Sequence, residues 1–208
     1  MKHLIEKWKE NKIIKDLEVE KAFLKADRKY FVPEEYKSKV YHDYPLHIGF
    51  QQTISQPTTV AIMTQALEVK KGQKILDIGS GSGWQAAVLS FLIGNKGKVI
   101  TIEYVKELAE LAKKNLEKLK IKNVEIIHGD GNNGHKKEAP YDRIIMAAYS
   151  GDFPKDLIKQ LKEDGIIIGP LGTEYNQEMI KARKIGKKLL RENLGNFIFV
   201  PLKDNKVK

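Results

Sequence analysis

The spacing of hydrophobic residues changes character near residue 70. Beyond that point, short apolar runs predict buried strands, and longer segments between them repeat apolar residues at helical spacing. The strand-like runs are residues 74–78, 98–103, 124–128, 141–147 and 165–169. The helical segments are 84–93, 105–120 and 154–161. Regular alternation of strands with helices predicts a parallel sheet covered by helices.

Before residue 70 the pattern is helical and irregular. Apolar spacing predicts helices over 4–9 and 19–26, the second capped by Asp16. A third helix is predicted over 57–67, where Pro57 suits the first turn. The stretch 41–50 carries Pro and Gly and is predicted to be a loop. At the other end of the chain, 187–191 and 197–202 are predicted to pair as a closing hairpin.

These elements together predict one α/β fold. We expect a doubly wound, mostly parallel, seven-stranded Rossmann-like sheet with helices on both faces. Residues 1–70 are expected to form a helical extension with a substrate loop, and 71–208 a cofactor-binding core. The two parts are predicted to make one compact unit, because no repeat or Pro/Gly linker divides the 208 residues.

The charge balance is basic, at +10, which by itself suggests acidic partners. However, 33 of the 37 basic residues are Lys, spread along the chain among Glu residues, and only four are Arg. Arg is the side chain that reads phosphates and base edges best. The composition therefore favours a solvated surface over a dedicated nucleic-acid face.

The chain has no Cys, which excludes disulfides, thiolate zinc sites and a cysteine nucleophile. Its five His residues lack metal-ligand spacing, so no metal site is expected. No apolar run approaches the ~20 residues of a membrane span, and the first residues lack the apolar core of a signal peptide. We expect a cytoplasmic monomer that does not associate with membranes.

A glycine-rich loop, D-I-G-S-G-S-G at residues 77–83, follows the first predicted strand and precedes a helix. Alternating glycines let the backbone turn sharply and approach a ligand at the carboxyl ends of the strands. A dinucleotide fingerprint requires Gly where Trp84 stands, and the Lys of a P-loop is absent. The loop resembles the first motif of S-adenosylmethionine-dependent methyltransferases, whose cofactor has no phosphate.

Acidic residues lie at or near the carboxyl ends of the first three predicted strands. Asp77 is placed to receive the cofactor's ammonium group, and Glu103, 24 residues after Gly79, to accept the ribose hydroxyls. Asp130 is placed to contact the adenine. Glu103 also suits a helix cap, and Asp130 an Asp-Gly turn. The predicted cofactor-binding residues are Asp77, Gly79, Ser80, Gly81, Gly83, Glu103, Asp130 and Gly131.

A more specific resemblance lies in I-G-F-Q-Q-T-I-S-Q-P, residues 48–57. This block is similar to the I-G-x-G-Q-T-I-S-Q-P signature of protein-L-isoaspartate O-methyltransferases, and further matching blocks run from about residue 20 to 202. The chain departs from the family pattern at His47, usually Pro, and at Gln51, usually Gly. It also departs over 147–151 and in its short tail.

The resemblance implies methyl transfer from S-adenosylmethionine to the free α-carboxylate of L-isoaspartyl, and also D-aspartyl, residues in age-damaged polypeptides. It implies a class I methyltransferase fold and assigns catalysis to Ser55, with Asp43, Thr53 and Ser55 at the substrate. The residues alone favour a helix cap for Ser55, and the resemblance reverses that preference. A carboxylate with a pKa near ~4 is already ionised at neutral pH, so no strong base is required.

Two other classes of function are considered. A nucleic-acid methyltransferase is suggested by the basic charge; attack on cytosine through cysteine is excluded, whereas ribose methylation is compatible with the motifs. The Asp/Asn-Pro-Pro-aromatic motif of exocyclic-amine methylation is absent at 146–149. The other class is a non-enzymatic module that keeps the cofactor fold.

Overall fold

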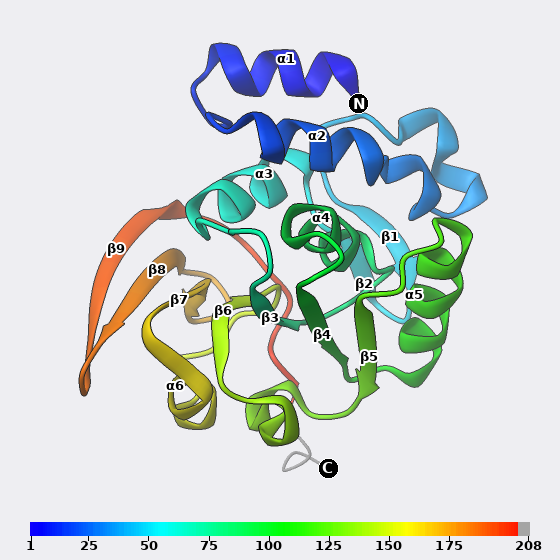
Figure 1. Ribbon diagram of the computed structural model, residues 1–208. Helices are drawn as coiled ribbons and strands as arrows, with labels where there is room; N and C mark the ends of the chain where they lie inside the picture. The colour runs from blue at the N-terminus through cyan, green and yellow to red at the C-terminus, as the bar shows by residue number, and fades with distance from the viewer. Residues whose placement is uncertain (204–208) are drawn as a thin grey trace.

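The computed structural model describes residues 1–203 and is built around a seven-stranded sheet (Figure 1). The strands, in spatial order, are β5 (Val124–His128), β4 (Lys98–Glu103), β3 (Lys74–Ile78), β6 (Tyr141–Met146), β7 (Leu161–Gly172), β8 (Gln177–Ile185) and β9 (Lys188–Asn196). The first five of these strands are parallel to one another. β8 is antiparallel to both of its neighbours, β7 and β9. This arrangement confirms the predicted doubly wound, mostly parallel sheet.

Helices cover both faces of the sheet (Figure 1). One face carries α3 (Pro57–Ala66), α4 (Trp84–Ile93) and α5 (Lys106–Lys118), and the other carries α6 (Lys155–Gln160). Consecutive side chains of β3 enter different cores, Ile75 under α3 and α4 and Leu76 on the α6 side. Burial on both faces explains why these strands read as continuous apolar runs.

The N-terminal helices α1 (Lys2–Glu10) and α2 (Leu17–Lys25) pack onto α3 and α4. Trp8, Phe23 and Trp84 form an edge-to-face aromatic row, with ring centroids 5.1 and 5.9 Å apart. The Trp84 indole also donates a hydrogen bond to the Ala26 carbonyl at 2.8 Å. The first 70 residues therefore share a core with the glycine-loop helix α4 rather than lying apart from it.

Part of the predicted 41–50 loop is a strand, β1 (Leu46–Gly49). It pairs with β2 (Gln52–Ile54), just beyond that stretch, as an antiparallel hairpin. Asp16 occupies the N-cap position of α2 as predicted, but its side chain makes no capping hydrogen bond. Short 3-10 helices complete the described elements: η1 (Arg28–Tyr30), η2 (Glu34–Lys39), η3 (Gly131–Asn133) and η4 (Lys136–Glu138).

The predicted closing hairpin is wrong. The chain turns at Gly186, whose φ is 58°, so the hairpin pairs β8 with β9 rather than 187–191 with 197–202. In β8 the buried Met179, Ile180 and Ala182 stand among charged residues, and the partly buried Lys181, Arg183 and Lys184 hide the strand pattern in the sequence. Segment 197–203 is not part of the hairpin and instead runs beside Tyr149, which pairs with Pro201.

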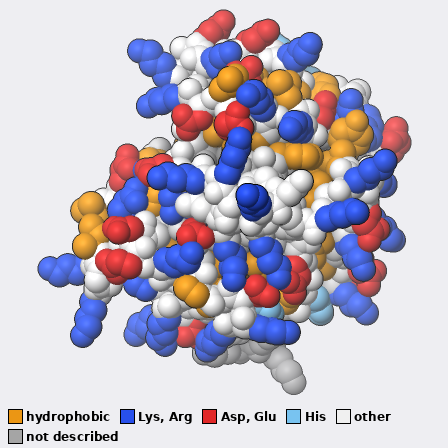
Figure 2. Space-filling model, viewed as in Figure 1, with side chains coloured by type: hydrophobic (Ala, Val, Ile, Leu, Met, Phe, Trp, Pro, Cys, Tyr) orange, Lys and Arg blue, Asp and Glu red, His pale blue; other side chains and the backbone are white. Residues whose placement is uncertain are grey.

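The surface seen in Figure 2 mixes Lys and Arg with Asp and Glu, without a continuous area of one sign. Fourteen ion pairs connect these charges within the described residues, each with at least one side chain more than a third exposed. Over residues 1–203, none of the helices combines the length and apolar character that crossing a membrane requires.

Candidate active site

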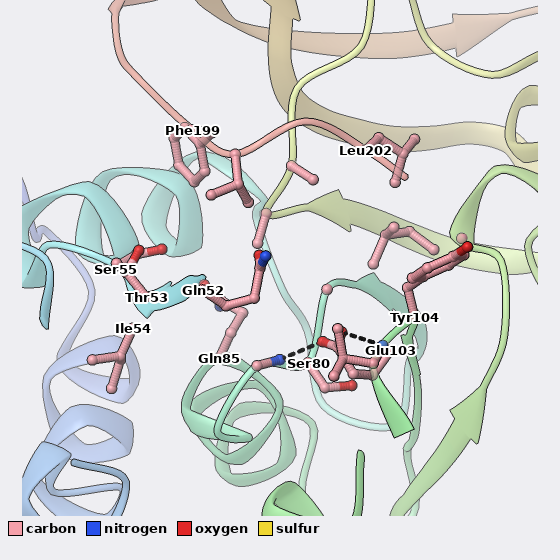
Figure 3. Close-up of a pocket in the computed structure, with 18 of the residues that line it drawn as sticks. Gln52, Thr53, Ile54, Ser55, Ser80, Gln85, Glu103, Tyr104, Phe199 and Leu202 are labelled. Atoms are coloured by element: carbon pink, nitrogen blue, oxygen red, sulfur yellow. Dashed lines mark hydrogen bonds between the residues drawn. The ribbon is translucent and has the colours of Figure 1, made fainter. Parts of the chain in front are cut away.

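A pocket opens at the carboxyl ends of β3, β4 and β6, where neighbouring connections leave the sheet in opposite directions. This is the position at which doubly wound sheets bind ligands. Figure 3 shows its walls: the β2 region on one side, the glycine loop and Glu103 below, and the C-terminal segment above. The main lining segments are 52–55, 78–82, 102–105, 147–148 and 199–203.

The glycine loop forms the floor of this pocket because its three glycines adopt positive φ angles, 94° at Gly79, 51° at Gly81 and 92° at Gly83. Side chains rarely tolerate this region, and Gly adopts it at little cost. A Cβ on Gly83 would also lie 3.2 Å from the Cβ of Ala112 in α5. Gly79, Ser80 and Gly81 line the pocket, whereas Gly83 lets α5 approach the loop.

Glu103 is buried at the end of β4 and faces the glycine loop. One carboxylate oxygen accepts the Gly81 backbone N–H at 2.8 Å, and the other accepts the Val105 N–H at 3.0 Å (Figure 3). Glu103 does not cap α5, because the N-cap is Val105 and no side chain caps that helix; it holds the Val105 N–H just before the helix begins. The same carboxylate lines the pocket, where it remains available to a ligand's hydroxyl groups.

Asp77 lies behind the loop, fully buried, and does not line the pocket. Its Oδ2 accepts the Thr101 hydroxyl at 2.7 Å, and Thr101 in turn contacts Ser80 at 2.6 Å. Its Oδ1 has no protein partner. Burial raises the pKa of Asp77 to about 7, against the lowering effect of the Thr101 hydrogen bond and with a smaller raising effect of Glu103.

Two of the three predicted substrate residues, Thr53 and Ser55, line the pocket on the wall opposite Glu103 (Figure 3). Ser55 is not a helix cap, because α3 has Gln56 at its N-cap and no side-chain capping bond. Asp43 lies outside the pocket lining. Its two oxygens accept the backbone N–H and the hydroxyl of Thr58 in the first turn of α3, at 2.9 and 2.7 Å.

A buried arginine, Arg28, holds the segment that carries Ser55. Its guanidinium donates to the carbonyl oxygens of Val40 at 2.9 Å and Ser55 at 3.0 Å. Further acceptors are the carbonyls of His42, Tyr44 and Ile54. Burial lowers the pKa of Arg28 to about 10, and Asp43 raises it in part. Sequence reasoning missed this residue, since its partners lie 12–27 positions away.

Of the two predicted cofactor residues that follow β5, Asp130 and Gly131, only Gly131 lines the pocket. Asp130 does not line the pocket; its Oδ1 accepts the Asn132 backbone N–H at 2.8 Å, which is the turn considered from the sequence. Gly131 does line the pocket. A Cβ at Gly131 would lie 2.5 Å from the Ile78 side chain, so only glycine fits that close approach.

The C-terminal segment 199–203 was not assigned to the site from the sequence, although it forms the upper wall of the pocket. Its only signal was the Val-Pro-Leu block at 200–202. Among the departures from the family pattern, Ala147 and Ala148 line the pocket. His47 and Gln51 are exposed and lie outside its lining.

Comparisons with known sequences match nearly the whole chain to proteins of one description. The family model described as Protein-L-isoaspartate(D-aspartate) O-methyltransferase (PCMT) matches residues 1–207. A protein-L-isoaspartate O-methyltransferase of Fervidobacterium nodosum is 46% identical over 181 residues, 87% of this chain and 91% of its own. One from Pyrobaculum islandicum is 43% identical over 203 residues, 97% and 98% of the two chains.

Solved structures give the same result. A protein-L-isoaspartate O-methyltransferase structure aligns with a TM-score of 0.90 and 31% identity over 98% of this chain, which spans 66% of that longer chain. A second, a putative protein-L-isoaspartate O-methyltransferase from Plasmodium falciparum in complex with S-adenosyl-L-homocysteine, aligns with a TM-score of 0.85 and 29% identity over 98% of both chains. These matches favour neither a nucleic-acid methyltransferase nor a non-enzymatic module. With its signature block lining a pocket beside the glycine loop, the chain belongs to the protein-L-isoaspartate(D-aspartate) O-methyltransferase family.

Proposed function

We propose that the protein transfers a methyl group from S-adenosylmethionine to the free α-carboxylate of isoaspartyl residues in damaged polypeptides. The observation that carries this proposal is a single pocket that joins the glycine loop and Glu103 to Thr53 and Ser55. The residues expected to bind the cofactor and those expected to bind the substrate therefore line the same pocket. D-Aspartyl residues, named in the family description, are the second substrate class.

The residues present fit S-adenosylmethionine. Glu103 offers a carboxylate for ribose hydroxyls, and the Gly79–Gly81 stretch brings bare backbone to the pocket. Asp77 lies behind the loop with Oδ1 lacking a protein partner, and a bound ammonium group nearby would favour its ionised form. When bound, the cofactor supplies an electrophilic methyl group on a sulfonium.

The remaining chemistry requires positioning rather than a base. The titratable side chains that line the pocket within the described residues are Glu103, Tyr104 and Lys203. A substrate carboxylate is ionised at neutral pH and needs no deprotonation. We infer that the hydroxyls of Thr53 and Ser55 hold this carboxylate, while apolar lining residues exclude water from it.

The test uses two peptides of identical sequence, one with isoaspartate and one with aspartate. Since a displacement of ~1 Å can cost ~100-fold in such a transfer, we expect at least ~1000-fold higher kcat/KM for the isoaspartyl peptide, about 4 kcal/mol. Comparable methylation of both peptides would overturn the proposal. Methyl transfer to RNA alone would support the nucleic-acid alternative. Action as a cytoplasmic monomer stays a prediction from the sequence.

A further inference from the structure

A second, shallow groove lies directly beside the pocket. It is lined by Tyr149, Glu174, Tyr175, Ile198, Phe199 and Pro201. Two of these residues, Phe199 and Pro201, also line the pocket itself. The groove therefore adjoins the pocket along Phe199 and Pro201.

Two large apolar side chains that line the groove are unusually exposed to solvent. Tyr175 is 86% exposed and Ile198 is 71% exposed, the two highest values among large hydrophobic residues in the described chain. Both flank the same groove. Isolated exposed hydrophobic residues are ordinary, but two of them in one groove beside a binding pocket offer apolar area that a bound molecule would bury.

The backbone around the groove is held in place by hydrogen bonds. The Gln177 side chain accepts the Phe199 N–H at 2.8 Å and donates to the Phe199 carbonyl at 3.2 Å. Tyr149 bonds through its backbone to Val200 and Leu202, at 2.9 and 2.8 Å. A surface fixed in advance loses little conformational entropy when a partner binds.

We propose that this groove binds apolar side chains of the substrate polypeptide on one side of the isoaspartyl residue. The inference rests on the proposed function, because a polypeptide substrate must extend beyond a pocket that holds one residue and the cofactor. Because Phe199 and Pro201 line both hollows, a residue that flanks the isoaspartyl residue on this side lies within reach of Tyr175 and Ile198. The groove thus sets a preference for the sequence around the damaged residue.

The experiment compares a blocked isoaspartyl tripeptide with an isoaspartyl nonapeptide that has Ile and Phe at its flanking positions. Tyr175→Ala and Ile198→Ala are each expected to raise KM for the nonapeptide at least about fivefold more than KM for the tripeptide. Leu190→Ala is the matched control, since Leu190 is 66% exposed on β9 and lines neither pocket nor groove. It should leave both KM values unchanged.

The outcomes separate this inference from the proposed function. Wild-type protein that methylates neither peptide would refute the function itself. With methylation established, an unchanged ratio of the two KM values in both variants would overturn the groove assignment, and so would an equal rise for both peptides. A concentration-dependent mass in sedimentation that Tyr175→Ala abolishes, with the KM ratio unchanged, would assign the groove to a second copy of the chain instead.

Discussion

The backbone N–H of Gly81 donates to the Glu103 carboxylate at 2.8 Å, so the residue at the end of β4 holds the glycine loop that precedes α4. The same carboxylate faces the pocket. Glu103 therefore links the shape of the loop to the site where we expect the ribose. Removing it should affect both the ligand and the loop.

We expect Glu103→Ala to weaken S-adenosylhomocysteine binding by about 2 kcal/mol, or ~30-fold, because it removes charged hydrogen bonds to the ribose. Loss of the Gly81 and Val105 contacts should also lower the free energy of unfolding by about 1 kcal/mol. Calorimetry and denaturant unfolding measure the two effects. Glu107→Ala, an exposed change in the first turn of α5, is the control. Equal affinity in Glu103→Ala would remove Glu103 from the cofactor site.

Ser55→Ala should lower turnover at least about tenfold, or 1.4 kcal/mol of barrier. Because Ser55 does not cap α3, its removal should leave the melting temperature nearly unchanged. Steady-state kinetics and thermal unfolding on the same samples test this, with the exposed Ser38→Ala as control. A variant that is destabilised but fully active would contradict a catalytic role for Ser55.

Asp43→Ala should destabilise the protein by about 1 kcal/mol, since Asp43 satisfies the Thr58 N–H at the start of α3. Asp43→Asn keeps an acceptor oxygen and should recover part of that loss. Denaturant unfolding of the three proteins gives the comparison. If Asp43→Ala instead raised KM for an isoaspartyl peptide with stability unaltered, Asp43 would belong to the substrate site as the family resemblance implies.

Asp77 should make stability depend on pH. Burial raises its pKa from the ordinary 3.8 to about 7, so between these values the folded protein binds more protons than the unfolded chain. The free energy of unfolding should therefore fall as pH rises from about 4 to 7, by as much as about 4 kcal/mol. Asp77→Asn should lack this component. Urea unfolding of the ligand-free protein at several pH values checks it, and parallel curves for the two proteins would refute it.

Arg28→Met should cost at least about 3 kcal/mol of stability, because the carbonyls of Val40, Tyr44 and Ser55 lose the donor that the buried guanidinium supplies. Arg28→Lys should recover only part, since an ammonium cannot match the spread of five carbonyl acceptors. Lys113→Met, on the exposed side of α5, is the control. Chemical denaturation measures all three, and an unaffected Arg28→Met would contradict the role of Arg28 in holding this segment.

The parallel core and the glycine loop could be predicted from the amino-acid sequence. Strands such as Lys74–Ile78 were predicted with their observed bounds, because burial on both faces makes them continuously apolar. The glycines at 79, 81 and 83 were readable because positive φ is a local requirement that few other residues meet. Thr53 and Ser55 were placed by their resemblance to a signature block, and they line the pocket.

Contacts between groups far apart in the sequence could be seen only in the folded chain. Asp43 pairs with Thr58 in α3, Arg28 with carbonyls up to Ser55, and the 199–203 segment closes the pocket. The pairing of β8 with β9 depends on a turn at Gly186, and charged residues within β8 hid that strand in the sequence. Local pattern fixes an element's period and its buried face. Hydrogen bonds between remote segments depend on how those elements pack, which no local pattern records.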